Sequence, residues 1–129
     1  MSLRTEHSIR NSKLAKELFA GKKYFDWVIT TSFYSAIHIV EERCLPRKIA
    51  GNTCDNIGEA MLAYGYRSRH QAREKLVHDS LDLQISIKYK WLDDQSRNAR
   101  YKTFKIKPQL AKKALEFLDS IQKECAPKK

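Results

Sequence analysis

Apolar side chains recur every three or four positions along most of the chain, which is the spacing of amphipathic helices. This pattern predicts helices over residues 5–20 and 23–44, with Leu14 and Leu18 on the inner face of the first. Gly21 lies between them, and we expect it to end the first helix in the left-handed conformation. Because the connection is short, the two helices should pack as an antiparallel hairpin.

The pattern breaks at Pro46, which cannot continue a helix. Residues 46–58 are rich in Pro, Gly, Asn and Thr and predict one long loop. A short helix over residues 59–64 should follow, and then a longer one over residues 67–82. The apolar stripe of that longer helix takes in Ala72, Leu76 and Leu83.

Residues 83–91 alternate between apolar and polar side chains, which is typical of a strand. We nevertheless predict a helix there, because nothing else in the sequence offers a partner strand and a lone strand is not stable. The last helix should begin at Pro108. Its apolar stripe comprises Leu110, Ala114, Leu115, Leu118 and Ile121. The sum is an all-α, up-down bundle of four to five helices, forming one domain over residues 1–129 with a short charged tail at 126–129.

Composition adds a strong charge to this fold. The 129 residues carry a formal net charge of +10, which favours attraction to nucleic acid, nucleotides or an acidic partner. Three cysteines, Cys44, Cys54 and Cys125, show neither disulfide-framework nor zinc-site spacing and fit a reducing compartment. With no signal peptide and no long apolar run, we expect a cytoplasmic protein.

The basic residues are concentrated in residues 97–113, which contain seven cationic side chains and no acidic one. Tyr101 and Phe104 lie among them, and cations with aromatic rings are the usual means of contacting a nucleotide or single-stranded RNA. The predicted binding residues are Arg97, Arg100, Tyr101, Lys102 and Lys105. The alternative is a solvated basic turn that keeps the protein soluble.

Histidines give two further candidates. Tyr34 and His38, one turn apart on an apolar helix, are predicted with His70 to be polar groups of the bundle interior. A metal site of His38, His70 and Glu41 or Glu42 is disfavoured because no metal-binding spacing supports it, and we predict no metal or other cofactor.

Arg73 and His78 form the candidate catalytic pair. A guanidinium can hold a scissile phosphate while an imidazole moves a proton, as RNA cleavage requires. The spacing of the two residues is common by chance in a chain with this many arginines.

Residues 14–122 resemble the HEPN family (higher eukaryotes and prokaryotes nucleotide-binding domain). The similarity is carried by residues 15–24 (AKELFAGKKY), 33–38 (FYSAIH), 97–101 (RNARY) and 113–118 (KALEFL). The resemblance implies a helical bundle that often forms a homodimer. It also implies a frequent association with a nucleotidyltransferase partner, as a toxin–antitoxin-like pair.

Some members of that family are metal-independent ribonucleases with an Arg and a His at the dimer interface. This sequence departs from that pattern, because the positions five to seven beyond Arg97 are Lys102, Thr103 and Phe104. It resembles the branch in which Arg97 and Tyr101 replace the nuclease pair, for which no cleavage is implied.

The leading hypothesis is therefore a HEPN-like module that binds a nucleotide, RNA or a nucleotidyltransferase partner through its basic face. One alternative is a dimeric ribonuclease that uses Arg73 as phosphate clamp and His78 as general acid–base. A second alternative is a structural bundle that binds a protein partner.

Overall fold

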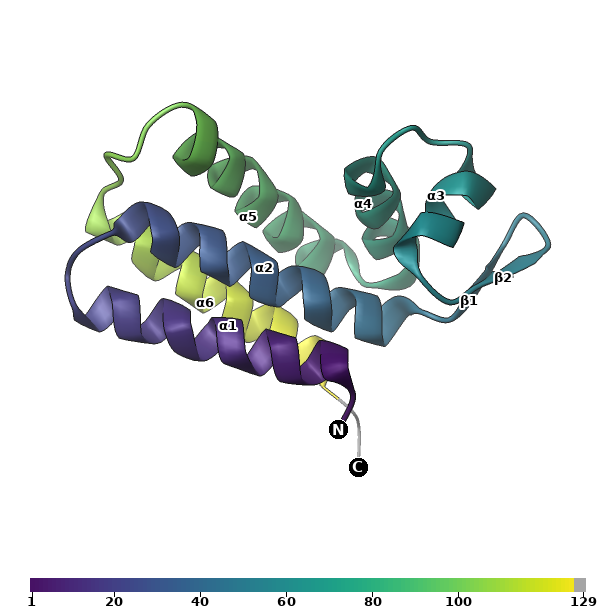
Figure 1. The fold of residues 1–129 in the computed structure, drawn as a ribbon, viewed down its shortest axis with the longest axis horizontal. Coiled ribbons are helices and arrows are strands. Elements are labelled where there is room, and N and C mark those ends of the chain that lie inside the picture. Colours follow the sequence, from purple (N-terminus) through teal and green to yellow (C-terminus); the bar gives the residue numbers. More distant parts are fainter. Residues whose placement is uncertain (127–129) are drawn as a thin grey trace.

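The computed structural model describes residues 1–126, and within them the chain is mainly helical (Figure 1). The elements are α1 (Leu3–Ala20), α2 (Phe25–Cys44), β1 (Arg47–Ile49), β2 (Asn52–Cys54), α3 (Ile57–Tyr64), α4 (Arg69–Ser80), α5 (Leu83–Tyr101) and α6 (Pro108–Cys125). Figure 1 shows α1, α2, α5 and α6 packed side by side, each running opposite to the one before it in this chain order. The predicted all-α bundle is confirmed, with six helices in the described residues rather than four to five.

Helix α2 is the centre of the fold. It packs against α1, α5 and α6 and also meets α4. Its residues Ile29, Phe33 and Val40 join Tyr89 of α5 and Leu118 of α6 in the main apolar core. A second apolar cluster connects the β1–β2 hairpin with α3 and α4 at one end of the bundle. None of the helices within residues 1–126 combines the length and the apolar character needed to cross a membrane.

Local sequence signals set where several helices begin. Ser2, Asn56, Ser68 and Asp82 each precede a helix, and the side chain of each accepts a hydrogen bond from a backbone N–H three residues later. Such a cap typically contributes about 1 kcal/mol. Helix α6 begins at Pro108, as predicted, because proline has no N–H to leave unpaired in a first turn.

The predicted helix over residues 83–91 is confirmed as the first half of α5. Ile85 and Tyr89 are buried, whereas Leu83 and Ile87 are exposed, so burial follows the helical period and not the alternation. The exposure of Leu83 also corrects its predicted place on the apolar stripe of the preceding helix, which ends at Ser80.

The predicted long loop at 46–58 is wrong. Residues 47–54 form an antiparallel hairpin in which Arg47 pairs with Cys54 and Ile49 with Asn52. Ala50 and Gly51 make the two-residue turn, both with positive φ (51° and 82°), as tight hairpin turns require. Ile49 and Cys54 are buried against α3 and α4, which gives this small sheet an apolar support.

Two details of the first helical hairpin also differ from expectation. Gly21 has a right-handed φ of −72°, and the left-handed residues of the turn are instead Lys22 and Tyr24. Leu14 is 43% exposed, because α1 packs on α2 through small side chains, Ser8, Ser12 and Ala15. Small residues allow the two helices to approach closely, which leaves the larger leucine outside.

Candidate functional site

A cavity of about 390 Å³ lies where α2, α4 and α5 meet. We call it the arginine cavity. It is lined by Phe33, Tyr34, Ile37 and His38 of α2, His70 and Arg73 of α4, and Asp93, Arg97 and Arg100 of α5. Its volume falls in the range of small-molecule sites.

Helical spacing explains why these side chains converge. Residues three, four or seven apart on a helix lie on the same face. Asp93, Arg97 and Arg100 are spaced in this way on α5, and His70 and Arg73 on α4. Tyr34 and His38 are four apart on α2. Three helices therefore each present one polar face to the same space.

Arg100 is the most available cation of the arginine cavity. Its Nη1 donates to the hydroxyl of Tyr34 at 3.1 Å, and its Nε donates to the carbonyl oxygen of Ser96 at 3.3 Å. The guanidinium also lies over the rings of Tyr34 and Tyr101, at 5.7 and 5.1 Å from the centroids. Within residues 1–126 no carboxylate is in ion-pair distance of it, so its charge is held in place but not neutralised.

Arg97 and His70 both contact the fully buried carboxylate of Asp93. The Nε of Arg97 lies 3.4 Å from one oxygen, and Nδ1 of His70 lies 2.9 Å from the other. Burial, together with the neighbouring Glu74 carboxylate, raises the pKa of Asp93, and Arg97 opposes this rise. The two oxygens of Asp93 thus each lie against a nitrogen of the cavity wall, at contact distance but without hydrogen-bond geometry.

Arg73 supplies the third guanidinium, and its Nε lies 3.6 Å from a carboxylate oxygen of Glu41. Arg73 thus faces Glu41 and Arg97 faces Asp93, whereas Arg100 faces no carboxylate in residues 1–126. The positive charge of Arg100 therefore remains in excess at the cavity, which suits an anionic ligand.

Both histidines of the cavity respond to this charge. Burial lowers the pKa of His38, and His7, Arg73 and Arg4 lower it further. Burial also lowers the pKa of His70, with Arg97 as the largest of the charged contributions and Glu74 acting in the opposite direction. Each imidazole is therefore mainly neutral at pH 7. Both ring nitrogens of His70 already face carboxylates, Asp93 at 2.9 Å and Glu74 at 3.4 Å, so His38 is the more available hydrogen-bond donor and acceptor.

His38 gives the fold a predictable dependence on pH. Because its folded pKa lies below the unfolded value of about 6.5, its neutral form is favoured by folding. This contribution to stability is complete above the unfolded pKa and is lost as the pH falls through it toward the folded pKa. We expect wild type to lose more unfolding free energy than His38→Gln between pH 7.5 and 5, measured by urea unfolding. An equal loss in both proteins would contradict this assignment.

One cluster near the cavity has the composition of a metal site. His70, Glu74 and Asp93 place one ligand atom each within 4.8 Å of one another. The two carboxylates already face cations, since Lys90 Nζ lies 3.5 Å from Glu74 and Arg97 lies against Asp93. We therefore interpret the cluster as a set of ion pairs beside the cavity and not as a metal site. The two carboxylates of the metal site considered from the sequence also have other partners. Glu41 pairs with Arg73, and Glu42 accepts a hydrogen bond from Ser2.

The structure separates the predicted catalytic pair. Five residues of helix rotate the chain by about 500°, so Arg73 and His78 point in directions about 140° apart. Arg73 lines the arginine cavity, whereas His78 lines a different cavity beside Tyr66 and Gln71. The His78 side chain is 66% exposed and contacts Asp79 at 3.3 Å. Within the single chain the two side chains line no common cavity.

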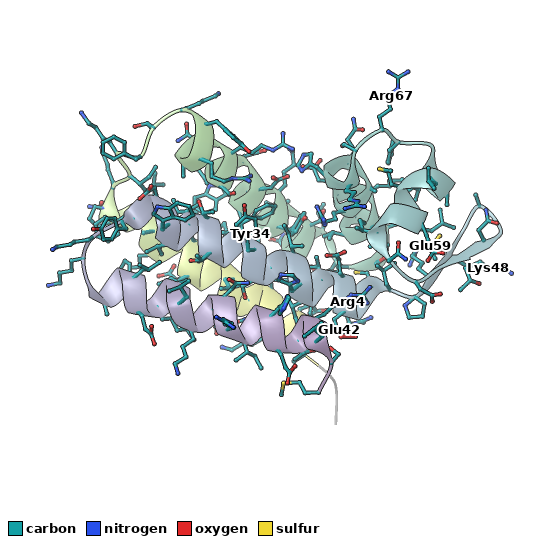
Figure 2. All side chains as sticks on the ribbon, in the orientation of Figure 1. Arg4, Tyr34, Glu42, Lys48, Glu59 and Arg67 are labelled. Carbon is teal, nitrogen blue, oxygen red and sulfur yellow. The ribbon has the colours of Figure 1, made fainter. Side chains whose placement is uncertain are left out.

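The other predicted residues fall into three groups. Tyr34, His38 and His70 line the arginine cavity rather than the closed interior, and Tyr34 is 36% exposed. Arg97 and Arg100 line the same cavity. Tyr101 and Lys102 line a neighbouring one, which Arg100 shares, and Lys105 is exposed but lines neither. In Figure 2 Tyr34 lies in the middle of α2 beside α5, far from Lys48 on the hairpin.

Asp93 is the charged residue of the cavity that the sequence analysis missed. The signal was present: Asp93 lies four residues after Tyr89 and before Arg97, on the face of α5 that also carries Ser96. A carboxylate on the buried face of a helix needs a cationic partner, and Arg97 lies about one helical turn further along α5.

Comparison with protein-family models, curated proteins and solved structures found no match. The resemblance to the HEPN family stays a prediction, as do the homodimer and the nucleotidyltransferase partner that it implies.

Proposed function

We propose that this chain is a helical module that binds the phosphate group of a nucleotide or of RNA in the arginine cavity. The observation that carries the proposal is Arg100, a guanidinium fixed by Tyr34 and Ser96 yet without a carboxylate partner among residues 1–126. Arg73 and Arg97 place two further guanidinium groups around it, each beside a carboxylate. Guanidinium groups match phosphate geometry with paired N–H donors, and hydrogen bonds to charged groups are among the strongest in proteins.

A neutral imidazole completes such a site. His38 offers an N–H donor or a nitrogen acceptor, and Tyr34 offers a hydroxyl that already receives the Arg100 hydrogen bond. The net charge of +10 would steer polyanions toward the protein from a distance, and this attraction weakens as salt is added.

Arg97→Gln tests the proposal directly. Glutamine keeps an N–H donor for Asp93 but removes the charge, so we expect about tenfold weaker binding of a labelled single-stranded RNA of about eight nucleotides. The measurement is fluorescence anisotropy at two salt concentrations in EDTA, with thermal melts to confirm folding.

Lys48→Ala is the matched control. It removes the same charge from an exposed position on the hairpin, remote from the cavity. Equal losses in the two variants would show that only net charge matters and would contradict a defined site. The same incubations are analysed for RNA fragments, and cleavage lost in Arg97→Gln would replace binding with a ribonuclease activity at this cavity.

A further inference from the structure

A second cavity of about 480 Å³ adjoins the arginine cavity. We call it the aromatic cavity, because Trp27, Tyr101 and Phe104 line it. Trp27 belongs to the first turns of α2, Tyr101 ends α5, and Phe104 lies in the segment between α5 and α6. In Figure 1 these segments meet at the end of the bundle opposite the hairpin.

The three rings are unusually exposed for aromatic side chains. Trp27 is 52% exposed, Phe104 72% and Tyr101 77%. Isolated exposed aromatics are common, but three around one cavity form an apolar surface of the kind that marks an interaction site. The fold does not need them there, since none belongs to either buried cluster.

Arg100 joins the two cavities. It lines both, and its guanidinium lies over the ring of Tyr34 on one side and of Tyr101 on the other. A ligand that places an anionic group on Arg100 therefore has the aromatic cavity directly beside it.

The lining residues divide the work between the cavities. In the arginine cavity, polar groups from three helices surround Arg100, while Arg73 faces Glu41 and Arg97 faces Asp93. The aromatic cavity instead offers three exposed rings, with Asp26 and Lys102 beside them. A phosphate is favoured in the first cavity, and a flat uncharged group is favoured in the second.

We propose that the aromatic cavity is the base-binding subsite of this site and that the ligand class is single-stranded nucleic acid. An unpaired base stacks on Trp27 and Phe104 while its neighbouring phosphate occupies the arginine cavity. Aromatic side chains beside cations are a general means of holding unpaired bases, because every base presents a π face. Paired bases in a duplex are already stacked and cannot enter. This inference rests on the proposed function.

A second copy of the chain is the competing occupant of this surface. It would bring a further net charge of +10 against the same cations, which opposes self-association. A polyanion gains from the same charge, so charge complementarity favours nucleic acid.

The test uses Trp27 as its own reporter. The chain has two tryptophans, and Trp91 packs edge-on against Phe117, so Trp91→Phe leaves Trp27 as the single tryptophan, whose fluorescence is excited selectively over that of the tyrosines. This protein is titrated with an unlabelled single-stranded oligonucleotide of about eight nucleotides, the same oligonucleotide as a duplex, and inorganic tripolyphosphate. We expect the single strand to quench Trp27 fluorescence, and neither the duplex nor tripolyphosphate to do so.

Affinities of variants separate this inference from the proposed function. Trp27→Ala and Phe104→Ala should each weaken binding of the single strand by about 5- to 150-fold and leave tripolyphosphate binding unchanged. Leu83→Ala is the control, since Leu83 is exposed on α5 and distant from both cavities.

Three outcomes would overturn the inference. If the single strand binds Trp91→Phe without quenching Trp27, and Trp27→Ala binds it as tightly as wild type, the phosphate site would remain without a base subsite. If Trp27→Ala and Phe104→Ala change the oligomeric state on gel filtration but leave oligonucleotide affinity unchanged, the surface would be assigned to a second copy of the chain. Failure of wild type to bind either polyanion would remove the proposed function as well.

Discussion

Leu118→Ala is expected to lower the free energy of unfolding by about 3 kcal/mol. Leu118 is 1% exposed in the centre of α6, where it belongs to the main core with Ile29 and Tyr89. Truncation loses the transfer energy of the removed atoms and leaves a cavity that a close-packed core cannot fill. Domains of this size have about 5–15 kcal/mol of total stability, so the loss is a large fraction.

Leu14→Ala is the control for that experiment. Both leucines lie on stripes that the sequence predicts to face inward, but Leu14 is 43% exposed. Its replacement should change stability by less than about 1 kcal/mol. Urea unfolding followed by circular dichroism measures both. Similar losses would contradict the packing of α1 on α2 through Ser8, Ser12 and Ala15.

This contrast shows which part of the fold the sequence could predict. Apolar periodicity is strong in α6, where every predicted stripe position is buried or half-buried, and the helix begins at the predicted proline. In α1 the inner face is made of Ser8, Ser12 and Ala15, whose small size hides the pattern. Ser8 and Ser35 are hydrogen-bonded across the α1–α2 interface at 3.0 Å, so polar residues also occupy interior positions there.

The hairpin at 47–54 escaped prediction for a different reason. Its strands are three residues each, too short to give a reliable alternating pattern. The turn uses Ala50 with positive φ, where Gly, Asn or Asp would be the expected signal. Contact with α3 and α4 stabilises the hairpin, and such tertiary contacts are not visible in local sequence.

The candidate site was predicted in pieces. Arg97 and Arg100 were identified from charge, but Arg73 was assigned to a pair with His78, and His38 and His70 were assigned to the interior. Spacing along one helix can place Arg97 beside Arg100. It cannot place α4 against α2 and α5, because that contact depends on the path of the chain through residues 45–68. The convergence of three helices on one cavity therefore appears only in the structure.

Arg100→Ala should have a larger effect on binding than Arg97→Gln. We expect affinity for single-stranded RNA to fall by about 30- to 100-fold, from the loss of charged hydrogen bonds and of cation–π stacking. Arg97 already contacts Asp93 and must share its charge with that carboxylate, whereas Arg100 has no such competitor in the described residues 1–126. Arg100 also borders both cavities, so its removal affects the phosphate and the base.

Arg100→Lys separates charge from geometry. Lysine keeps the positive charge, so the salt dependence of binding should match that of wild type, while Arg100→Ala should reduce the log–log slope by about 0.7. Lysine lacks the planar fork that stacks between Tyr34 and Tyr101, and we expect it to recover only a small part of the lost affinity. Full recovery by lysine would show that Arg100 acts as a point charge. An Arg100→Ala loss no greater than that of Lys48→Ala would remove Arg100 from the site, and with it the connection between the two cavities.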